Sequence, residues 1–418
     1  MLERYYVYPE TWDRIRSSWI GGHIESYVEW LTENKYSFRT VLKRVPILME
    51  FGEFARQHGA KKLEDLPGYI EKFSRYWLKK HGQGCKTDKA REGVRLEGQR
   101  PVKQMLRLVI PDFEKSSGDE PLQSMAPGYF EYLRNERGLS EKTIILYRHY
   151  LRSFEAYLQE ISLNELTSLS PVILSGFVKY KSKGLCKASL GLRCTALRVF
   201  LRYLYRERII TKDLCHAIDS PRIYRLSSIP RSITWDEVNR MLEAVDCRTA
   251  IGKRDYAILL LMVTYGIRAR EVAALTLDDI DWRKERLLVP ERKANHSTAY
   301  PLSPIVGQAI LDYLQHGRPK TSDRHIFFRT RPPYIPMAFN GVSTRVVRYL
   351  RKAGVHVDRV GSHTLRHTCV QRLVDASFSL KSIGDYVGHG NPKSTEIYAK
   401  VAVDALREIG SGLGEDVL

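Results

Sequence analysis

The chain has 418 residues, of which 43% are hydrophobic and 28% charged, and its 67 Lys and Arg exceed its 48 Asp and Glu by 19. This composition excludes a small disulfide-stapled scaffold and a globally disordered chain. At roughly 150 residues per domain, the length predicts two or three globular domains. The positive surplus must face solvent, and a polyanion that releases counterions gains most from it, which makes nucleic acid the leading partner.

Membrane and secretory signals are absent from the sequence pattern. The longest strongly apolar run, residues 256–263, is far shorter than the roughly 20 residues that cross a bilayer. The first six residues lack the apolar stretch of a signal peptide, and no basic amphipathic helix stands out as a membrane-surface anchor. The six cysteines are scattered without C-x-x-C spacing, which indicates reduced structural thiols. We expect a soluble cytoplasmic protein without a membrane partner.

Residues 120–215 have the periodicity of a helical bundle, with predicted helices over 128–137, 140–160, 170–183 and 187–208. In the last helix, Arg198, Arg202 and Arg206 recur every fourth residue beside an apolar stripe. Like charges at this spacing repel, so we expect the stripe to lie on DNA phosphates, with a solvated helix face as the alternative. The other expected DNA contacts on these helices are Lys142, Thr143, Arg148 and Lys187.

The carboxy-terminal half has a mixed pattern. Residues 221–231 are bracketed by prolines, lack periodicity and indicate an interdomain linker. Helices are predicted over 235–245 and 254–265, a β-hairpin over 286–302, and helices again over 342–409, before a flexible glycine-rich tail. The predicted fold is mainly α-helical with a small antiparallel β-sheet.

The amino-terminal region contains an internal repeat of the helical bundle. Tyr27-Val28-Glu29-Trp30-Leu31 parallels Tyr129-Phe130-Glu131-Tyr132-Leu133. The alignment continues over five further positions. It pairs Thr40, Leu48, Phe51, Phe54 and Leu66 with Thr143, Leu151, Phe154, Tyr157 and Leu169. We interpret residues 1–118 as a diverged copy of the bundle. The alternative is a chance likeness of two amphipathic segments.

Several familiar catalytic motifs are excluded. Gly252-Lys253 is followed by Arg254, so no phosphate-binding P-loop is present, and no G-x-S-x-G nucleophile elbow occurs. His363 and His367 have the spacing of a zinc pair, but Thr364 stands where a metalloprotease needs Glu. We expect no metal and no cofactor.

Cationic residues in turn and helix settings remain as candidates. Arg268 lies at a turn between two helices, His363 and Arg366 share a helix face, and His389 lies in a tight turn before the helix that carries Tyr398. Each has an ordinary structural explanation, such as pairing of Arg268 with Glu271. Their joint order and spacing is the informative feature.

Together these residues resemble the tyrosine recombinase family, also called phage integrases, over residues 120–410, and are most similar to Xer-type recombinases and simple integrases. Tyr386-Val387-Gly388-His389, followed nine residues later by Tyr398, supports the resemblance. It implies six catalytic residues: Arg268, Lys293, His363, Arg366, His389 and Tyr398. The family lysine usually lies in a Gly-Lys-Gly turn, so here Arg292 or His296 competes with Lys293 for its role.

The resemblance implies a domain order and a chemistry. A helical SAM-like core-binding domain (119–220), the linker (221–231) and a catalytic domain (232–418) would follow the extra domain (1–118). The two arginines would hold the phosphate oxygens while the tyrosine attacks, giving a 3′-phosphotyrosyl enzyme and, after strand exchange, a Holliday junction. The lysine would protonate the leaving oxygen.

The functional hypothesis is a site-specific recombinase or integrase, or the transposase of a mobile element. The competing hypotheses are a type IB topoisomerase-like relaxase and a catalytically silent DNA-binding partner of a recombinase. The implied partners are a double-stranded recombination site, three further copies in a homotetramer, and sister recombinases or DNA-bending proteins. The implied location is the nucleoid of a bacterium. For the amino-terminal copy, DNA binding and protein–protein assembly both stay open.

Overall fold

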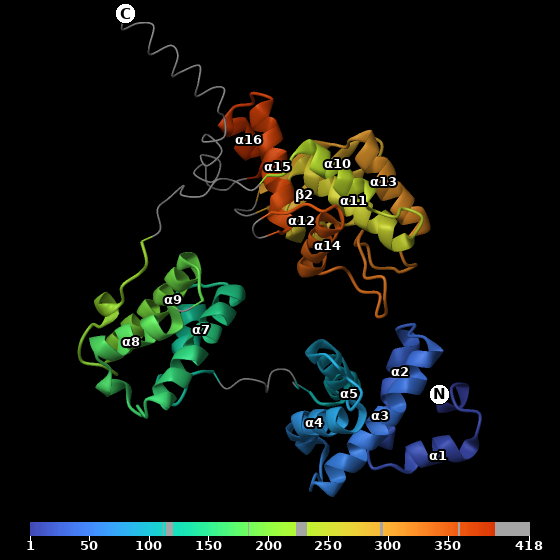
Figure 1. Cartoon of the computed structure of the whole chain (residues 1–418), viewed down its shortest axis with the longest axis vertical. Helices are drawn as coiled ribbons and strands as arrows, with labels where there is room; N and C mark the ends of the chain where they lie inside the picture. The colour runs from blue at the N-terminus through green and yellow to red at the C-terminus, as the bar shows by residue number, and fades with distance from the viewer. Residues whose placement is uncertain are drawn as a thin grey trace, which may run out of the picture. The chain divides into compact units, whose positions relative to one another are not determined.

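The computed structural model describes residues 1–111, 113, 120–182, 184–222, 232–292, 296–357 and 360–388. The chain divides into two compact units, one containing residues 1–28 and 42–227 and the other residues 29–41 and 228–418. The helices and strands are therefore described group by group (Figure 1). Within the described ranges, no helix is long and apolar enough to cross a membrane.

The described residues of the amino-terminal segment form helices joined by turns and loops, without a strand. Its α-helices are α1 (Pro9–Ser17), α2 (Gly21–Glu33), α3 (Phe38–Gln57), α4 (Ile70–His81) and α5 (Asp88–Val109). Two 3-10 helices, Leu2–Arg4 and Leu63–Tyr69, precede α1 and α4. Helices α4 and α5 pack against each other as a helical hairpin.

The next group contains α6 (Tyr129–Asn135), α7 (Glu141–Glu160), α8 (Pro171–Ser182) and α9 (Lys187–Arg206), with 3-10 helices at Leu166–Ser168 and Cys215–Ala217. Helices α7 and α8 each pack on α9, which lies beside both in Figure 1. Aromatic and aliphatic residues between 122 and 218 form one apolar core. The predicted helices of this region are confirmed to within two residues at their ends.

The carboxy-terminal group contains most of the remaining helices. They are α10 (Trp235–Glu243), α11 (Ala250–Tyr265), α12 (Ala269–Ala274), α13 (Pro304–His316), α14 (Phe339–Lys352), α15 (Ser362–Asp375) and α16 (Leu380–Val387), with a 3-10 helix at Leu277–Asp279. Helix α11 begins four residues before its predicted start, because the Thr249 side chain caps it at the amide of Gly252. Helix α13, which begins with Pro304 at its first turn, was not predicted.

A three-stranded antiparallel sheet accompanies these helices. Strands β1 (Ile280–Asp281), β2 (Arg286–Arg292) and β3 (His296–Pro301) lie in the order β1-β2-β3. In the hairpin, Leu287 pairs with Tyr300, and the register shifts between Val289 and Arg292. The predicted hairpin is confirmed, and the short strand β1 is an addition to it.

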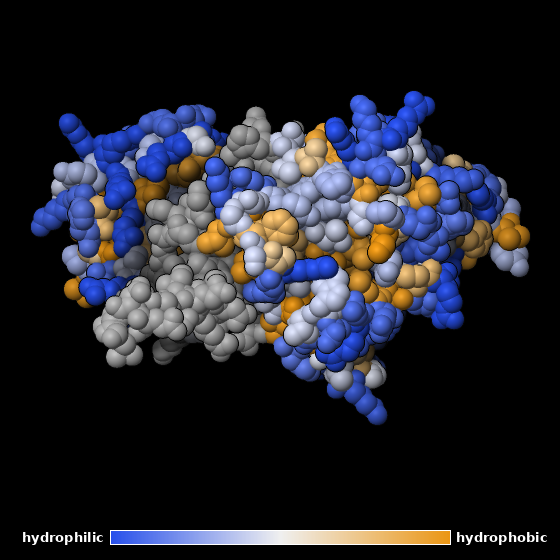
Figure 2. Space-filling view, turned by 90° about the horizontal axis from the view of Figure 1, so that it is seen from above, coloured by the Kyte–Doolittle hydropathy of each residue, from blue (hydrophilic) through white to orange (hydrophobic). Residues whose placement is uncertain are grey.

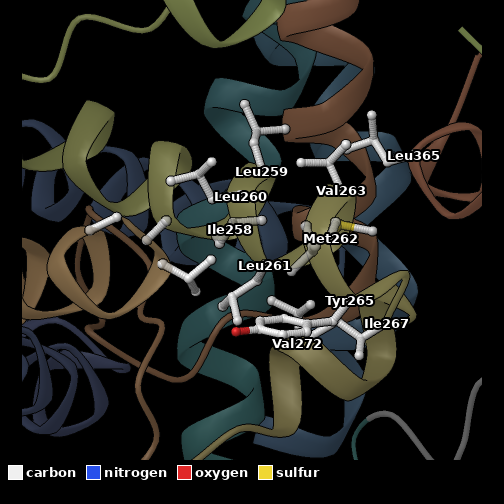
Figure 3. Close-up of a cluster of buried hydrophobic side chains, with 14 of the residues drawn as sticks. Ile258, Leu259, Leu260, Leu261, Met262, Val263, Tyr265, Ile267, Val272 and Leu365 are labelled. Carbon is white, nitrogen blue, oxygen red and sulfur yellow. The ribbon is translucent and has the colours of Figure 1, made fainter. Parts of the chain in front are cut away.

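Helix α11 is the centre of the carboxy-terminal core. Eleven of its sixteen residues are buried, which is the expected state of a helix that is apolar on all sides. Its side chains point in several directions, and Leu365 of α15 and Val272 of α12 lie near them (Figure 3). The end of α11 is consequently held in place from several sides, and the candidate site begins there.

Charged and polar side chains cover much of the visible surface, and apolar side chains reach it in patches between them (Figure 2). This distribution is the ordinary one for a folded globular chain, in which apolar residues still contribute part of the surface.

Candidate functional site

The turn after α11 positions the first predicted arginine. Gly266 ends α11 with φ of 60°, in the left-handed region that glycine adopts without strain. Arg268 then precedes α12, and its backbone amide donates to Glu271 Oε2 at 2.8 Å. Its guanidinium donates from Nη1 to Glu271 Oε1 at 2.7 Å and from Nη2 to the carbonyl oxygen of Gly388 at 3.1 Å. The carboxylate and the carbonyl together fix the orientation of the Arg268 side chain.

Helix α15 brings the second arginine to the same turn. Arg366 is 5% exposed, and its Nη1 donates to the carbonyl oxygen of Gly266 at 2.6 Å. His363 lies one turn earlier on α15 and reaches solvent. Partial desolvation, followed by the charges of Arg366 and Arg268, lowers the pKa of His363 from its ordinary value of 6.5. The two arginines therefore form a cationic group beside His363, whose imidazole is neutral at pH 7.

A cysteine borders this group without being a suitable nucleophile. Cys369 lies one turn after Arg366 and is buried, with Sγ 3.5 Å from the carbonyl oxygen of Thr264. Burial raises the pKa of Cys369 to about 12, although the nearby charges of Arg366 and Arg372 oppose the shift. The thiol is protonated at physiological pH, so it lacks the thiolate that nucleophilic chemistry needs.

Two tyrosines connect the hairpin to the end of α16. The hydroxyl of Tyr300 on β3 donates to the carbonyl oxygen of Tyr386, and the hydroxyl of Tyr386 donates to the carbonyl oxygen of Thr264 at 3.1 Å. Their rings meet edge to face with centroids 5.0 Å apart. Tyr386 lies two residues before Gly388, whose carbonyl holds Arg268. The sequence pattern contained Tyr386 as a family match, but nothing in it indicated the contact with Tyr300.

Three of the six predicted catalytic residues lie outside the described residues: Lys293, His389 and Tyr398. Their neighbours are nevertheless placed. Strand β2 ends one residue before Lys293, and β3 begins three residues after it. Gly388 directly precedes His389. The choice among Lys293, Arg292 and His296 stays open. The linker prediction for residues 221–231 also falls mostly outside the described part of the chain.

The predicted DNA contacts on α7 and α9 have mixed environments. Lys142, Lys187 and Arg202 are exposed. Thr143 belongs to the cap of α7, where its amide donates to Ser140 Oγ at 3.4 Å. Arg148 is partly buried and donates from Nη2 to Glu120 Oε1 at 3.2 Å.

Two arginines of the predicted phosphate-binding stripe have partners within the protein. Arg198 donates from Nη2 to the carbonyl oxygen of Ile218 at 2.8 Å and to Ser220 Oγ at 2.7 Å. Arg206 donates to Glu136 Oε1 at 3.1 Å and Glu207 Oε1 at 2.8 Å. The two carboxylates beside Arg206 offset part of the charge repulsion on which the stripe argument depends, whereas the acceptors of Arg198 are neutral. DNA contact by the stripe stays a prediction.

One group of metal-ligand types occurs among the described residues. Asp213, Cys215 and His216 place their ligand atoms within 4.8 Å of one another. However, Asp213 Oδ1 accepts the amide of Cys215, two residues later, at 2.9 Å, which is the ordinary local bond of an aspartate in an Asx-turn. This turn accounts for the closeness of the three residues, so we assign no metal to them.

The site offers charge for an anion and a neutral base beside it. Two guanidiniums fixed by backbone carbonyls can donate to oxygens of a phosphodiester, and the neutral imidazole can accept a proton. The two carbonyls belong to the turns at Gly266 and Gly388, 100 and 120 positions away from the arginines that they bind. Only the folded chain brings these groups together.

Comparisons with known proteins agree with this geometry. Residues 231–404 match the phage integrase family, and residues 127–208 match the phage integrase N-terminal SAM-like domain. The integrase/recombinase y4rA of Sinorhizobium fredii is 34% identical over 391 residues, which cover 93% of each chain. The tyrosine recombinase XerD of Lacticaseibacillus casei is 28% identical over 67% of this chain and 95% of its own.

Solved structures share the fold. XerH bound to palindromic difH in a post-cleavage complex has a TM-score of 0.55 at 18% identity, covering 84% of this chain and 96% of its own. A lambda integrase dimer bound to a COC′ core site has a TM-score of 0.53 at 20% identity, covering 65% and 92%. The chain therefore belongs to the phage integrase family of tyrosine recombinases, which are DNA strand-transferring enzymes.

Proposed function

We propose that this protein is a site-specific recombinase that cleaves and rejoins DNA strands through a covalent bond between Tyr398 and a 3′-phosphate. The observation that carries the proposal is the grouping of two arginines and a histidine near the turn at Gly266. Arg366 donates to the Gly266 carbonyl, Arg268 follows that residue by two positions, and both arginine charges act on His363. Two arginines and a neutral imidazole suit a phosphodiester, which gains negative charge during attack.

The two arginines differ in burial and in the groups that hold them. Arg268 is 27% exposed in its side chain and carries the partly buried carboxylate of Glu271 beside it. Arg366 is nearly fully buried and is held by a backbone carbonyl. Burial costs the guanidinium its hydration, so a phosphate oxygen that replaces the lost water is strongly favoured. We assign both arginines to the non-bridging oxygens of the cleaved phosphate.

In the first step, the phenolic oxygen of Tyr398 attacks phosphorus, a tyrosyl O–P bond forms and the P–O5′ bond breaks. We assign His363 to accept the phenolic proton and Lys293 to protonate the leaving 5′-oxygen, while His389 hydrogen-bonds a non-bridging oxygen. The 5′-hydroxyl of a partner strand then reverses the reaction on the phosphotyrosine. Because one phosphoester replaces another, the exchange needs no external energy source.

Strand exchange between two duplexes needs two active sites on each, so we propose a tetramer on synapsed recombination sites. A lambda integrase tetramer bound to a Holliday junction is among the structures that share the fold, with a TM-score of 0.53. We further propose that residues 119–220 and 232–418 are separate domains on either side of the linker. The matches to two distinct family models support that division.

The decisive experiment traps the covalent intermediate. Wild-type protein and Tyr398→Phe are incubated with nicked duplexes from the DNA that flanks the gene, denatured, and assayed for protein-linked DNA. We expect an adduct with wild type and none with Tyr398→Phe, because phenylalanine has no attacking oxygen. An adduct that persists in Tyr398→Phe would refute the assigned nucleophile, and no adduct with either would favour a silent DNA-binding protein.

A second assay separates recombination from relaxation. A supercoiled plasmid without a recombination site is incubated with the wild type. A type IB topoisomerase-like enzyme relaxes it, whereas the proposed recombinase acts only when two sites are present.

A further inference from the structure

The amino-terminal helices repeat the local structure of the SAM-like bundle. Helices α3 and α7 both have 20 residues, and both of their ends are 103 positions apart (141 − 38 and 160 − 57). Each directly follows a serine whose Oγ accepts the backbone amide of the residue three positions later. The distance is 3.3 Å from Thr40 N to Ser37 Oγ and 3.4 Å from Thr143 N to Ser140 Oγ.

The turns on both sides of these helices also correspond. Two residues before each serine, Lys35 and Gly138 have φ of 58° and 57°. After each helix, the chain reverses through an equivalent bond, from the amide of Ala60 to Ala55 and from Leu163 to Leu158, both at 2.9 Å. Chance similarity of two amphipathic helices does not explain matching left-handed residues and matching turn bonds, because these depend on loop geometry.

The packing of the next helix corresponds as well. Phe51 contacts Phe73 with ring centroids 5.2 Å apart, and Phe154 contacts Phe177 at 4.9 Å. The adjacent aromatic pairs repeat in the same order. In the first copy, the ring of Phe54 lies 5.5 Å from Phe73 and 5.0 Å from Tyr76. In the second copy, the ring of Tyr157 lies 5.4 Å from Phe177 and 5.7 Å from Tyr180. Residues 21–109 thus have the helix order and the α3–α4 packing of residues 129–206.

Both copies carry cations where the third helix ends and the fourth begins. In the second copy these include Lys179 in the last turn of α8 and Lys187 at the start of α9. In the first copy, the six-residue loop 82–87 joins the packed helices α4 and α5, so the flanking helix ends lie at one corner. We call five exposed residues there the basic corner: Lys79, Lys80, Lys86, Lys89 and Arg91.

The charges of the basic corner are weakly compensated. Lys80 pairs with Glu50 at 2.6 Å, and the nearby Glu92 is engaged by Arg95 at 2.8 Å. Among the described residues, Lys79, Lys86, Lys89 and Arg91 form no ion pair. Asp88 is the remaining carboxylate in the first turn of α5.

The position of these cations opposes helix stability. Lys89 and Arg91 lie near the positive end of the α5 dipole, where a cation is destabilising. A phosphate bound at this corner would offset both the dipole and the side-chain charges. The first copy therefore has the charge pattern of a surface that binds a polyanion.

We propose that residues 21–109 are a second SAM-like bundle and that its basic corner binds the phosphate backbone of duplex DNA. The inference rests on the proposed function for its partner, since a DNA recombinase holds duplex DNA while it acts. The proposal gives each protomer a second DNA-binding surface, in addition to the segment that matches the SAM-like family model, residues 127–208.

The test compares two full-length triple variants. Lys79→Gln, Lys86→Gln and Lys89→Gln remove three charges from the basic corner. Arg56→Gln, Lys61→Gln and Lys62→Gln remove three exposed charges near the opposite end of α4. Affinity for a long duplex of unrelated sequence is measured at several salt concentrations, and the slope of log affinity against log salt is compared with wild type.

Each phosphate contact contributes about 0.9 to that slope. We expect the basic-corner variant to lose about 2 to 3 from the slope, the control variant to keep the wild-type slope, and Lys→Arg replacements at the corner to restore it. Equal slopes in the two triple variants would overturn the proposal. An unchanged slope with an altered oligomer mass would assign the corner to protein–protein contact instead.

The covalent-trapping assay keeps the two proposals separate. Arg56, Lys61 and Lys62 lie outside both the assigned catalytic residues and the basic corner, so the control variant should form the Tyr398 adduct on a nicked site to the same extent as the wild type. A slope change without any adduct, even in wild type, would refute the proposed chemistry and leave the second DNA-binding surface intact.

Discussion

Tyr386 shows how one hydroxyl can position groups that it does not touch. It donates to Thr264 in the last turn of α11 and accepts Tyr300 at its own carbonyl. These bonds join β3, α11 and the end of α16, the three elements next to the proposed catalytic groups. A residue with this geometry is expected to act through positioning, and not through contact with the phosphate.

Tyr386→Phe removes the 3.1 Å bond to Thr264 and keeps the ring. We expect a stability loss of about 1 kcal/mol and a fall of about tenfold in the single-turnover cleavage rate. The control is Tyr349→Phe, which removes a buried 3.1 Å bond to Asp255 Oδ2 in the same half of the chain. It should lower the melting temperature and leave the cleavage rate unchanged. Equal rate losses in both variants would indicate a general stability effect.

The lowered pKa of His363 predicts a dependence on pH with a definite sign. Desolvation and the two arginines make the folded protein bind this proton less well than the unfolded chain, whose histidine keeps a pKa near 6.5. As pH falls below about 6.5, the unfolded chain takes up the proton first, so the free energy of unfolding decreases. The decrease from this group ends once pH passes below its folded pKa.

His363→Asn should remove this contribution. Between pH 7 and pH 5, the free energy of unfolding should therefore decrease less in the variant than in the wild type. If His363 accepts the tyrosine proton, wild-type cleavage also falls as pH drops through the folded pKa. Denaturant titrations and single-turnover rates at several pH values measure both effects. An identical acid limb in His363→Asn would exclude the histidine as the base.

At the scale of elements, the turn at Gly266 joins α11 to α12 and supplies the carbonyl that Arg366 binds. Its φ is 60°, and an added Cβ would lie 3.1 Å from Val387 Cγ1 and 3.2 Å from Cys369 Sγ. Both the backbone conformation and the close packing of α15 and α16 therefore require glycine.

Gly266→Ala should cost about 1–2 kcal/mol for the left-handed backbone and about 1–3 kcal/mol more for overpacking. It should also slow cleavage, because Arg366 moves with its acceptor. Gly354→Ala is the matched control, since Gly354 has φ of 68° and no atom within 4 Å of an added Cβ. Thermal unfolding and cleavage rates compare the two. Equal stability losses would show that packing at Gly266 is not restrictive.

Helix boundaries were the most predictable feature at this scale. The α7 helix begins after Ser140 and ends at Glu160 as predicted, because capping side chains and apolar periodicity act within a few residues. Helix α13 has a local signal of the same kind, Pro304 in its first turn followed by apolar residues, although the predicted elements do not include it.

At the scale of the whole molecule, the apolar residues form separate cores. One core lies between residues 122 and 218, and another between 233 and 365. Separate cores in a chain of this length predict more than one cooperative unfolding step.

Phe200→Ala tests this independence. Phe200 is 0% exposed in the first of these cores, and its ring lies 5.0 Å from that of Tyr129. Truncation should cost about 3–5 kcal/mol and lower one calorimetric transition while the other stays in place. A single transition that shifts as a whole would show that the cores unfold together.

The sequence determined the features that depend on neighbouring residues. Caps, periodicity and turn residues placed most helices. The family resemblance implied the chemistry before any contact was known, and it is carried by Arg268, Lys293, His363, Arg366, His389 and Tyr398. The charge surplus indicated the class of partner, because net charge is a property of composition alone.

Only the tertiary structure decided which groups hold the arginines. Arg366 and Arg268 bind the carbonyls of Gly266 and Gly388, and every residue has a carbonyl, so no residue type marks these acceptors in the sequence. For the same reason, the pairing of Arg198 with the Ile218 carbonyl was invisible, and a stripe expected to face DNA is partly engaged within the protein. Local patterns determine which residues share an element, whereas contacts between distant backbone groups exist only once the chain has folded.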